Sequence, residues 1–145
     1  MDSVARPLSS YDLHLHTFWS YDATAPVETI FERARMLGMR CLAITEHHVL
    51  DSLPRVKRVA AGYPEIRVIP AAELSVTTSI GAVDLLCYGF PSSIPEGIHA
   101  VLDQYHAWQR DHGSAVSAGM QAIGIDYTDE RRLELIRSYR PAETI

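Results

Sequence analysis

The sequence predicts an α/β protein with a parallel sheet, and two observations support this. Short apolar runs alternate with stretches whose apolar residues recur at helical spacing, which is the pattern of β/α units. Side chains of the kind that bind metals follow several of the apolar runs. The active sites of β/α barrels and open α/β sheets form at the carboxyl ends of strands, where loops converge. The predicted fold and the position of the chemistry therefore agree.

The front part of the chain yields most of the expected elements. A first strand is expected at 12–16, followed by a helix that begins near Pro26 and ends at Gly38. The apolar residues that define the buried face of this helix are Val27, Ile30, Phe31, Ala34 and Leu37. The elements expected after it are strands at 41–45, 67–72 and 83–88, a helix at 53–61, and a turn at 77–81.

The pattern changes after Pro95. Apolar residues then follow helical spacing as far as Ile123, which predicts one long amphipathic helix or two helices broken near Gly113. Thr128 is expected to cap a last helix over 129–138. We expect one domain over 1–145, with the strands in 11–90 and a helical segment in 95–140.

The composition limits the class of protein. The chain has 145 residues, 47% of them hydrophobic, and a net charge of −5, which suits one domain with a real core. We expect no non-specific binding to nucleic acid, because the sequence has no basic stripe. We also expect no membrane association, because no apolar run is long enough to span a bilayer and residues 1–10 lack the apolar core of a secretory signal.

Cys41 and Cys87 lie in apolar runs, so we expect reduced, buried thiols and a cytoplasmic protein.

The most informative segment carries Asp12, His14 and His16 at alternate positions. Successive side chains of a strand point to opposite faces, so these groups are expected on one face. Two neighbouring imidazoles on a rigid element suit a divalent metal ion better than an apolar core. A histidine pair also occurs as an ordinary surface or buried polar pair, so this motif alone leaves both interpretations open.

More candidate ligands follow the second and third predicted strands: Glu46, His47 and His48, then Glu73. A buried carboxylate at a strand end is costly to desolvate without a partner, which favours metal binding by Glu73. Asp22 lies in a loop, where aspartate serves as a turn residue or as a ligand. His48 is interpreted as an extra ligand, a substrate contact or a surface residue.

Taken in order, these motifs resemble the PHP (polymerase and histidinol phosphatase) domain superfamily over about residues 11–88. The resemblance rests on Asp12-Leu13-His14-Leu15-His16-Thr17, Ser20 with Asp22, Ile44-Thr45-Glu46-His47-His48, and Glu73. The stretch Leu86-Cys87-Tyr88-Gly89-Phe90 and the long helix after it are similar to the branch of small phosphoesterases that act on nucleotides and short oligonucleotides.

The resemblance implies a distorted β/α barrel that binds two or three divalent metal ions: zinc, manganese or iron. His14 and His16 would bind one ion. Glu73 would bridge that ion to a second, and Asp22 and His47 would belong to a third position. No side chain beyond these ligands is assigned a catalytic role, because metal-bound hydroxide would attack phosphorus in line.

Other residues would support this chemistry. Asp12 would orient a ligand imidazole, and Glu46 would support the ligands from a position where family members usually carry aspartate. His48 and Trp19 are candidate substrate contacts. Trp19 and Tyr21 would stack on a base, wall the site or pack under their loop.

The family completes its site with further histidines and an Asp-x-His motif that have no match in this sequence. A closed barrel needs roughly 200 residues or more, so we expect an incomplete barrel, the front portion of such a protein. Its strand edges would be covered by a helix or by a homo-oligomer. The resemblance implies a metal-dependent hydrolase of a small phosphomonoester, a nucleotide or a short oligonucleotide. The alternatives are a metal-binding module without activity and, with less support, a PHP-like domain of a DNA polymerase assembly.

Overall fold

The computed structural model describes residues 9–132 and residue 134. The chain forms two compact units that divide between Ser93 and Ile94. The elements of the first unit are β1 (Tyr11–Leu15), α1 (Val27–Leu37), β2 (Cys41–Ile44), α2 (Leu53–Ala60), β3 (Arg67–Val68), β4 (Ala71–Thr78) and β5 (Gly81–Tyr88). The second unit contains α3 (Glu96–Ala122). The predicted α/β class is confirmed, and the expectation of a single domain stays a prediction.

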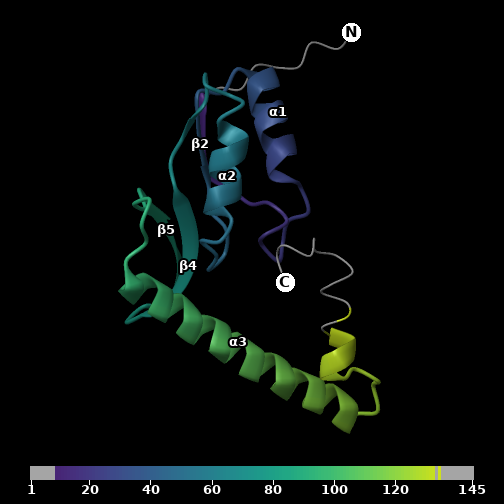
Figure 1. Ribbon diagram of the computed structural model, residues 1–145. Helices are drawn as coiled ribbons and strands as arrows, with labels where there is room; N and C mark the ends of the chain where they lie inside the picture. The colour runs from purple at the N-terminus through teal and green to yellow at the C-terminus, as the bar shows by residue number, and fades with distance from the viewer. Residues whose placement is uncertain (1–8, 133, 135–145) are drawn as a thin grey trace. The chain divides into compact units, whose positions relative to one another are not determined.

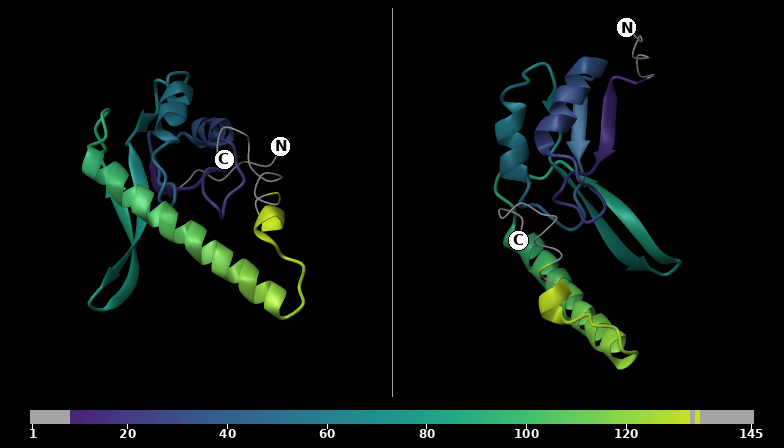
Figure 2. Two further views of the ribbon diagram at one scale, coloured as in Figure 1. Left: turned by 60° about the horizontal axis from the view of Figure 1, so that its bottom comes forward. Right: turned by 90° about the vertical axis from the view of Figure 1, so that its right-hand side faces the viewer.

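A parallel sheet of β1, β2 and β3, in that order, organises the first unit. Helices α1 and α2 provide the two crossovers and lie side by side in Figure 1. The right-hand view of Figure 2 shows β1 beside β2, with the antiparallel hairpin of β4 and β5 extending from the unit. Among the described residues, these two small sheets do not close into a barrel, in agreement with the predicted incomplete barrel.

One apolar core holds the helices to the sheet. Its buried members come from both helices, from β2 and from the adjoining loops: Val27, Phe31, Ala34, Met39, Leu42, Ile44, Val56 and Ile66. The predicted buried face of α1 is confirmed, with Val27, Phe31 and Ala34 buried and Ile30 and Leu37 packed against the cluster. The core therefore fixes β1 and β2, the strands whose ends carry the candidate ligands.

The end of α1 is where the sequence predicts it. Gly38 has a φ of 72°, a left-handed conformation in which a Cβ is strained. Its N–H donates to the Arg35 carbonyl, and the Met39 N–H donates to the Ala34 carbonyl. This cap turns the chain directly into β2.

We expect Gly38→Ala to lower the free energy of unfolding by roughly 1 kcal/mol, because an alanine there must adopt the left-handed conformation. No atom lies within 4 Å of the Cβ that would be added, so the effect isolates backbone strain. Urea unfolding followed by circular dichroism would measure it. The control is Gly62→Ala in the same unit, where φ lies outside the positive range. Equal effects of the two substitutions would contradict the prediction.

The predicted strand at 67–72 is wrong in one respect. It divides at Ile69 and Pro70, so that β3 is a short parallel strand and β4 starts a separate hairpin. Proline lacks the N–H that would continue the ladder, and the Pro70 carbonyl instead accepts the N–H of Gly89. The predicted turn at 77–81 and the strand after it are confirmed, since β4 and β5 pair antiparallel from Thr78 and Gly81.

In the second unit, α3 is continuous through Gly113, so the alternative of two helices broken there is wrong. A single glycine costs a long helix only about 1 kcal/mol. Thr128 Oγ1 accepts the Arg131 N–H at 3.1 Å, which confirms the predicted cap. The predicted extent of the last helix, to residue 138, reaches outside the described residues.

The structure bears on two expectations drawn from the composition, one about the cysteines and one about membrane-spanning helices. Cys41 and Cys87 are free, as predicted, but both are half-buried rather than buried. Among the described helices, none is both long and apolar enough to cross a membrane.

Candidate metal centre

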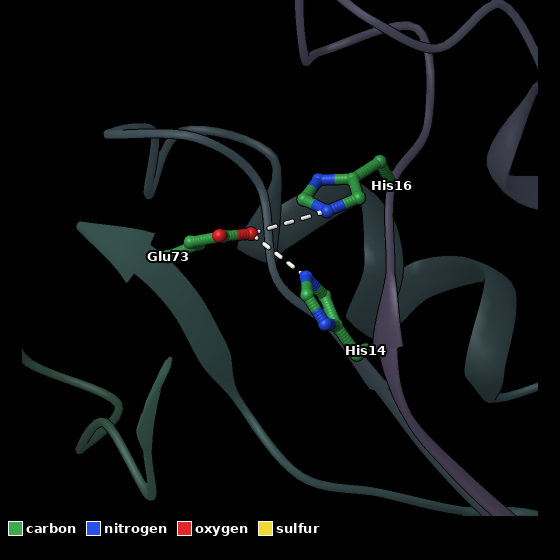
Figure 3. A group of neighbouring side chains, drawn as sticks. All are labelled: His14, His16 and Glu73. Atoms are coloured by element: carbon green, nitrogen blue, oxygen red, sulfur yellow. Dashed lines mark hydrogen bonds and ion pairs between the residues drawn. The ribbon is translucent and has the colours of Figure 1, made fainter. Parts of the chain in front are cut away.

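His14, which lies in β1, and His16, which follows the strand directly, reach the site beside a bulge. The register with β2 pairs Asp12 with Leu42 and Leu15 with Ile44, so β1 carries one extra residue between these pairs. Bulges re-aim side chains and are frequent beside active sites. The simple alternation assumed for this strand is therefore interrupted, yet His14 and His16 still turn toward the same carboxylate (Figure 3).

That carboxylate belongs to Glu73, which enters from β4. Its Oε2 lies 2.8 Å from His14 Nε2 and 3.2 Å from His16 Nε2, and Figure 3 shows the three groups converging. The Glu73 side chain is 5% exposed, so its charge is taken out of water and held by imidazoles. The expectation that Glu73 ends a strand is wrong, because it is the third residue of β4.

Backbone pairing explains how Glu73 nevertheless reaches the end of the parallel sheet. His47 and Glu73 form an isolated parallel bridge. The Glu73 N–H donates to the Glu46 carbonyl at 3.0 Å, and the His48 N–H donates to the Glu73 carbonyl at 2.9 Å. The start of the hairpin thus continues the parallel sheet beyond β2 and places Glu73 beside the histidines.

His47 and Asp22 complete the group. His47 Nδ1 lies 3.8 Å from Glu73 Oε2, and its Nε2 lies 3.3 Å from Asp22 Oδ2. The structure therefore brings together five side chains from separate segments, which we call the donor cluster: His14, His16, Asp22, His47 and Glu73. They include two groups whose ligand atoms lie within 4.8 Å of one another, His14 with His16 and Glu73, and His16 with Asp22 and His47.

A buried carboxylate behind the donor cluster holds the loop in place. Glu46 is fully buried, and it accepts hydrogen bonds from the hydroxyls of Thr17 and Ser20 and from the Thr17 N–H. Ser20 Oγ also accepts the His47 N–H at 3.0 Å and lies 3.3 Å from His16 Nδ1. Burial raises the pKa of the Glu46 carboxyl, although the Ser20 and Thr17 hydrogen bonds act in the opposite direction. The Glu46 carboxylate is hydrogen-bonded to Thr17 and Ser20, and Ser20 in turn contacts His16 and His47 of the donor cluster.

Three other candidate residues do not belong to the two groups of donor atoms found among the described residues. Asp12 Oδ1 accepts the His14 backbone N–H at 3.3 Å, so it contacts the main chain where an imidazole contact was expected. His48 is buried at a φ of 54°, so the alternative of a surface residue is wrong; its Nε2 accepts the Ser75 N–H, and its role as a substrate contact stays a prediction. Trp19 packs against the apolar core, which favours packing over stacking on a base.

Tyr21 is the aromatic residue that faces the donor cluster. Its ring stacks on His47, with centroids 4.8 Å apart and planes at 26°, and the side chain is 73% exposed. Trp19 and Tyr21 are equivalent by sequence, because both flank Ser20 in one loop. Only the fold shows which ring turns to the core and which to the site.

The donor cluster fits a divalent metal site. Mixed imidazole and carboxylate ligation is typical of zinc, manganese and iron, and a buried carboxylate among imidazoles is the arrangement that a cation stabilises. His14, His16 and Glu73 would hold one ion, and His16, Asp22 and His47 have their ligand atoms close enough for another. The hydrogen bonds of Ser20, which is itself bonded to Glu46, would hold the His16 imidazole and the His47 backbone in place.

Comparison with known proteins identifies the family. The family model of the PHP domain matches residues 12–140, so this chain belongs to the PHP domain family. Its predicted membership, and the predicted incomplete PHP-type fold, are confirmed. No curated protein matches the chain.

Two of the solved structures that match the chain illustrate the shared fold. An amidohydrolase from Chromobacterium violaceum, with bound sulfate and no metal, superposes with a TM-score of 0.68 at 21% identity over 86% of this chain. A predicted metal-dependent phosphoesterase from Bifidobacterium adolescentis superposes with a TM-score of 0.68 at 20% identity over 91% of this chain. The chain spans 46% and 45% of their lengths.

Proposed function

We propose that this chain carries the metal site of a hydrolase that cleaves phosphate esters. The observation that carries the proposal is the buried Glu73 carboxylate, which lies within 4 Å of nitrogen atoms of His14, His16 and His47. Membership of the PHP domain family and the likeness to a predicted metal-dependent phosphoesterase support it. We further propose that the substrate is small: a phosphomonoester, a nucleotide or a short oligonucleotide.

Each residue of the site has a proposed role. His14, His16 and Glu73 would hold one ion, and His47 with Asp22 would extend the site toward a second or third. Bound divalent ions supply charge neutralisation for the phosphate and a water of lowered pKa. Glu46, through Ser20, holds the backbone of His47 and the imidazole of His16 in place before an ion binds.

The test is hydrolysis by the purified chain with and without metal. We expect turnover of an aryl phosphate or its diester after loading with manganese or zinc, and loss of turnover after treatment with a chelator. Since one structural neighbour is an amidohydrolase, an N-acyl amide is included, and cleavage of the amide alone would overturn the proposal. Full metal loading without cleavage of any ester would favour the alternative of an inactive metal-binding module.

A further inference from the structure

We propose that Tyr21 is a stacking platform that makes this site selective for phosphoesters carrying a planar aromatic group. The inference rests on the proposed function, because it takes the phosphate to bind at the donor cluster. It adds the chemical class of the organic group and the residue that recognises it.

The first argument is the geometry of the rings. His16 and His47 stack with centroids 4.5 Å apart and planes at 11°, and Tyr21 stacks on His47 at 4.8 Å and 26°. The three rings form a column that leads from the donor cluster to the surface. With one face of Tyr21 on His47 and 73% of the side chain exposed, the column ends in an aromatic surface open to a ligand.

The second argument is that the platform is held before any ligand arrives. The residue before Tyr21 is the buried Ser20, whose hydroxyl is bonded to Glu46 and to the His47 N–H. The residue after it is Asp22, whose carboxylate contacts His47 Nε2 at 3.3 Å. A loop anchored on both sides loses little entropy when it binds a ligand. An aromatic ring also offers large contact area for few rotatable bonds.

The third argument is the position of the ring relative to the chemistry. Tyr21 stacks directly on His47, a member of the donor cluster, so its ring adjoins the groups that would bind the phosphate, and we take the organic group to extend toward it. An aryl ester and a nucleobase both present a flat π-face, and stacking on such a face tolerates different rings. An aliphatic ester presents no such face and gains less from the platform.

The test uses binding of phosphonates that cannot be hydrolysed, measured by calorimetry on the manganese-loaded chain. We expect phenylphosphonate to bind roughly tenfold more tightly than methylphosphonate, the usual size of one aromatic stacking contact. Tyr21→Phe should keep this preference, and Tyr21→Leu should remove it by lowering phenylphosphonate affinity more than methylphosphonate affinity. Tyr11→Leu, a substitution of another exposed tyrosine at the start of β1, is the matched control and should keep the preference.

The outcomes separate this inference from the proposed function. If wild-type chain shows no preference for phenylphosphonate, or binds neither phosphonate, the platform is overturned. If Tyr21→Leu weakens manganese and methylphosphonate binding as much as phenylphosphonate binding, Tyr21 only covers His47, and the platform is again overturned. If the preference is present without hydrolysis of any ester, the platform stands and the proposed activity fails. A non-hydrolysable phosphonate of adenosine tests the nucleobase separately from the aryl group.

Discussion

Glu73→Gln is expected to lower divalent metal affinity by at least about 100-fold, beyond the roughly 10–100-fold typical of residues that only support ligands. Glutamine keeps the shape of the side chain but removes the negative charge that balances a cation. The Glu73 side chain is 5% exposed and contacts three imidazoles, so water cannot replace the lost carboxylate. Metal content after dialysis, together with calorimetric titration, would measure the loss.

The matched control for this substitution is Glu65→Gln, which makes the same chemical change at an exposed position before β3. It should leave metal content unchanged. His14→Ala should also lower metal affinity, since His14 Nε2 is the closest imidazole nitrogen to Glu73 Oε2. Full metal stoichiometry in both Glu73→Gln and His14→Ala would show that the metal site lies elsewhere.

Glu46→Ala is expected to lower the free energy of unfolding by about 3 kcal/mol or more, because buried donors that lose their acceptor cost roughly 1–3 kcal/mol each. The donors are the Thr17 N–H and the hydroxyls of Thr17 and Ser20, and both residues are buried. The substitution would also leave a cavity. Urea unfolding would measure the change in free energy.

Conservative variants separate two contributions of Glu46 to the free energy of unfolding, that of its hydrogen bonds and that of its side-chain volume. Glu46→Gln keeps the volume and one acceptor oxygen, so it should cost clearly less than Glu46→Ala. Glu46→Asp keeps the carboxylate but shortens the side chain by one methylene, so it should reach Thr17 and Ser20 less well. If Glu46→Ala were as stable as wild type, Glu46 would not hold the loop.

Local chemistry explains why the elements of the first unit were predictable. The spacing of Val27, Phe31 and Ala34 specifies the buried face of α1, and Gly38 ends the helix because its left-handed φ disfavours other residues. The strand at 67–72 was mispredicted because an apolar run does not reveal its partner. Pro70 ends the pairing with β2, and the following residues pair with β5 instead.

The sequence predicted the set of candidate ligands, but not the residues that hold those ligands in place. The motifs named His14, His16 and Glu73, whose ligand atoms do lie within 4.8 Å of one another. The groups that donate hydrogen bonds to Glu46, and the choice between Trp19 and Tyr21, depend on how a loop folds over the end of the sheet. No spacing rule describes such a loop, because its conformation follows from contacts with Glu46 and His47, just after β2, and with the core.

The amino-acid sequence by itself determined the kinds of donor atom, their order along the chain and the secondary structure that carries them, since these depend on residue type and local periodicity. The tertiary structure alone decided which donors face one another. His14 and Glu73 are 59 residues apart, and they meet because a bulge turns β1 and a parallel bridge joins the start of β4 to the end of β2. Contacts of that range arise from the packing of whole elements, which no local pattern encodes.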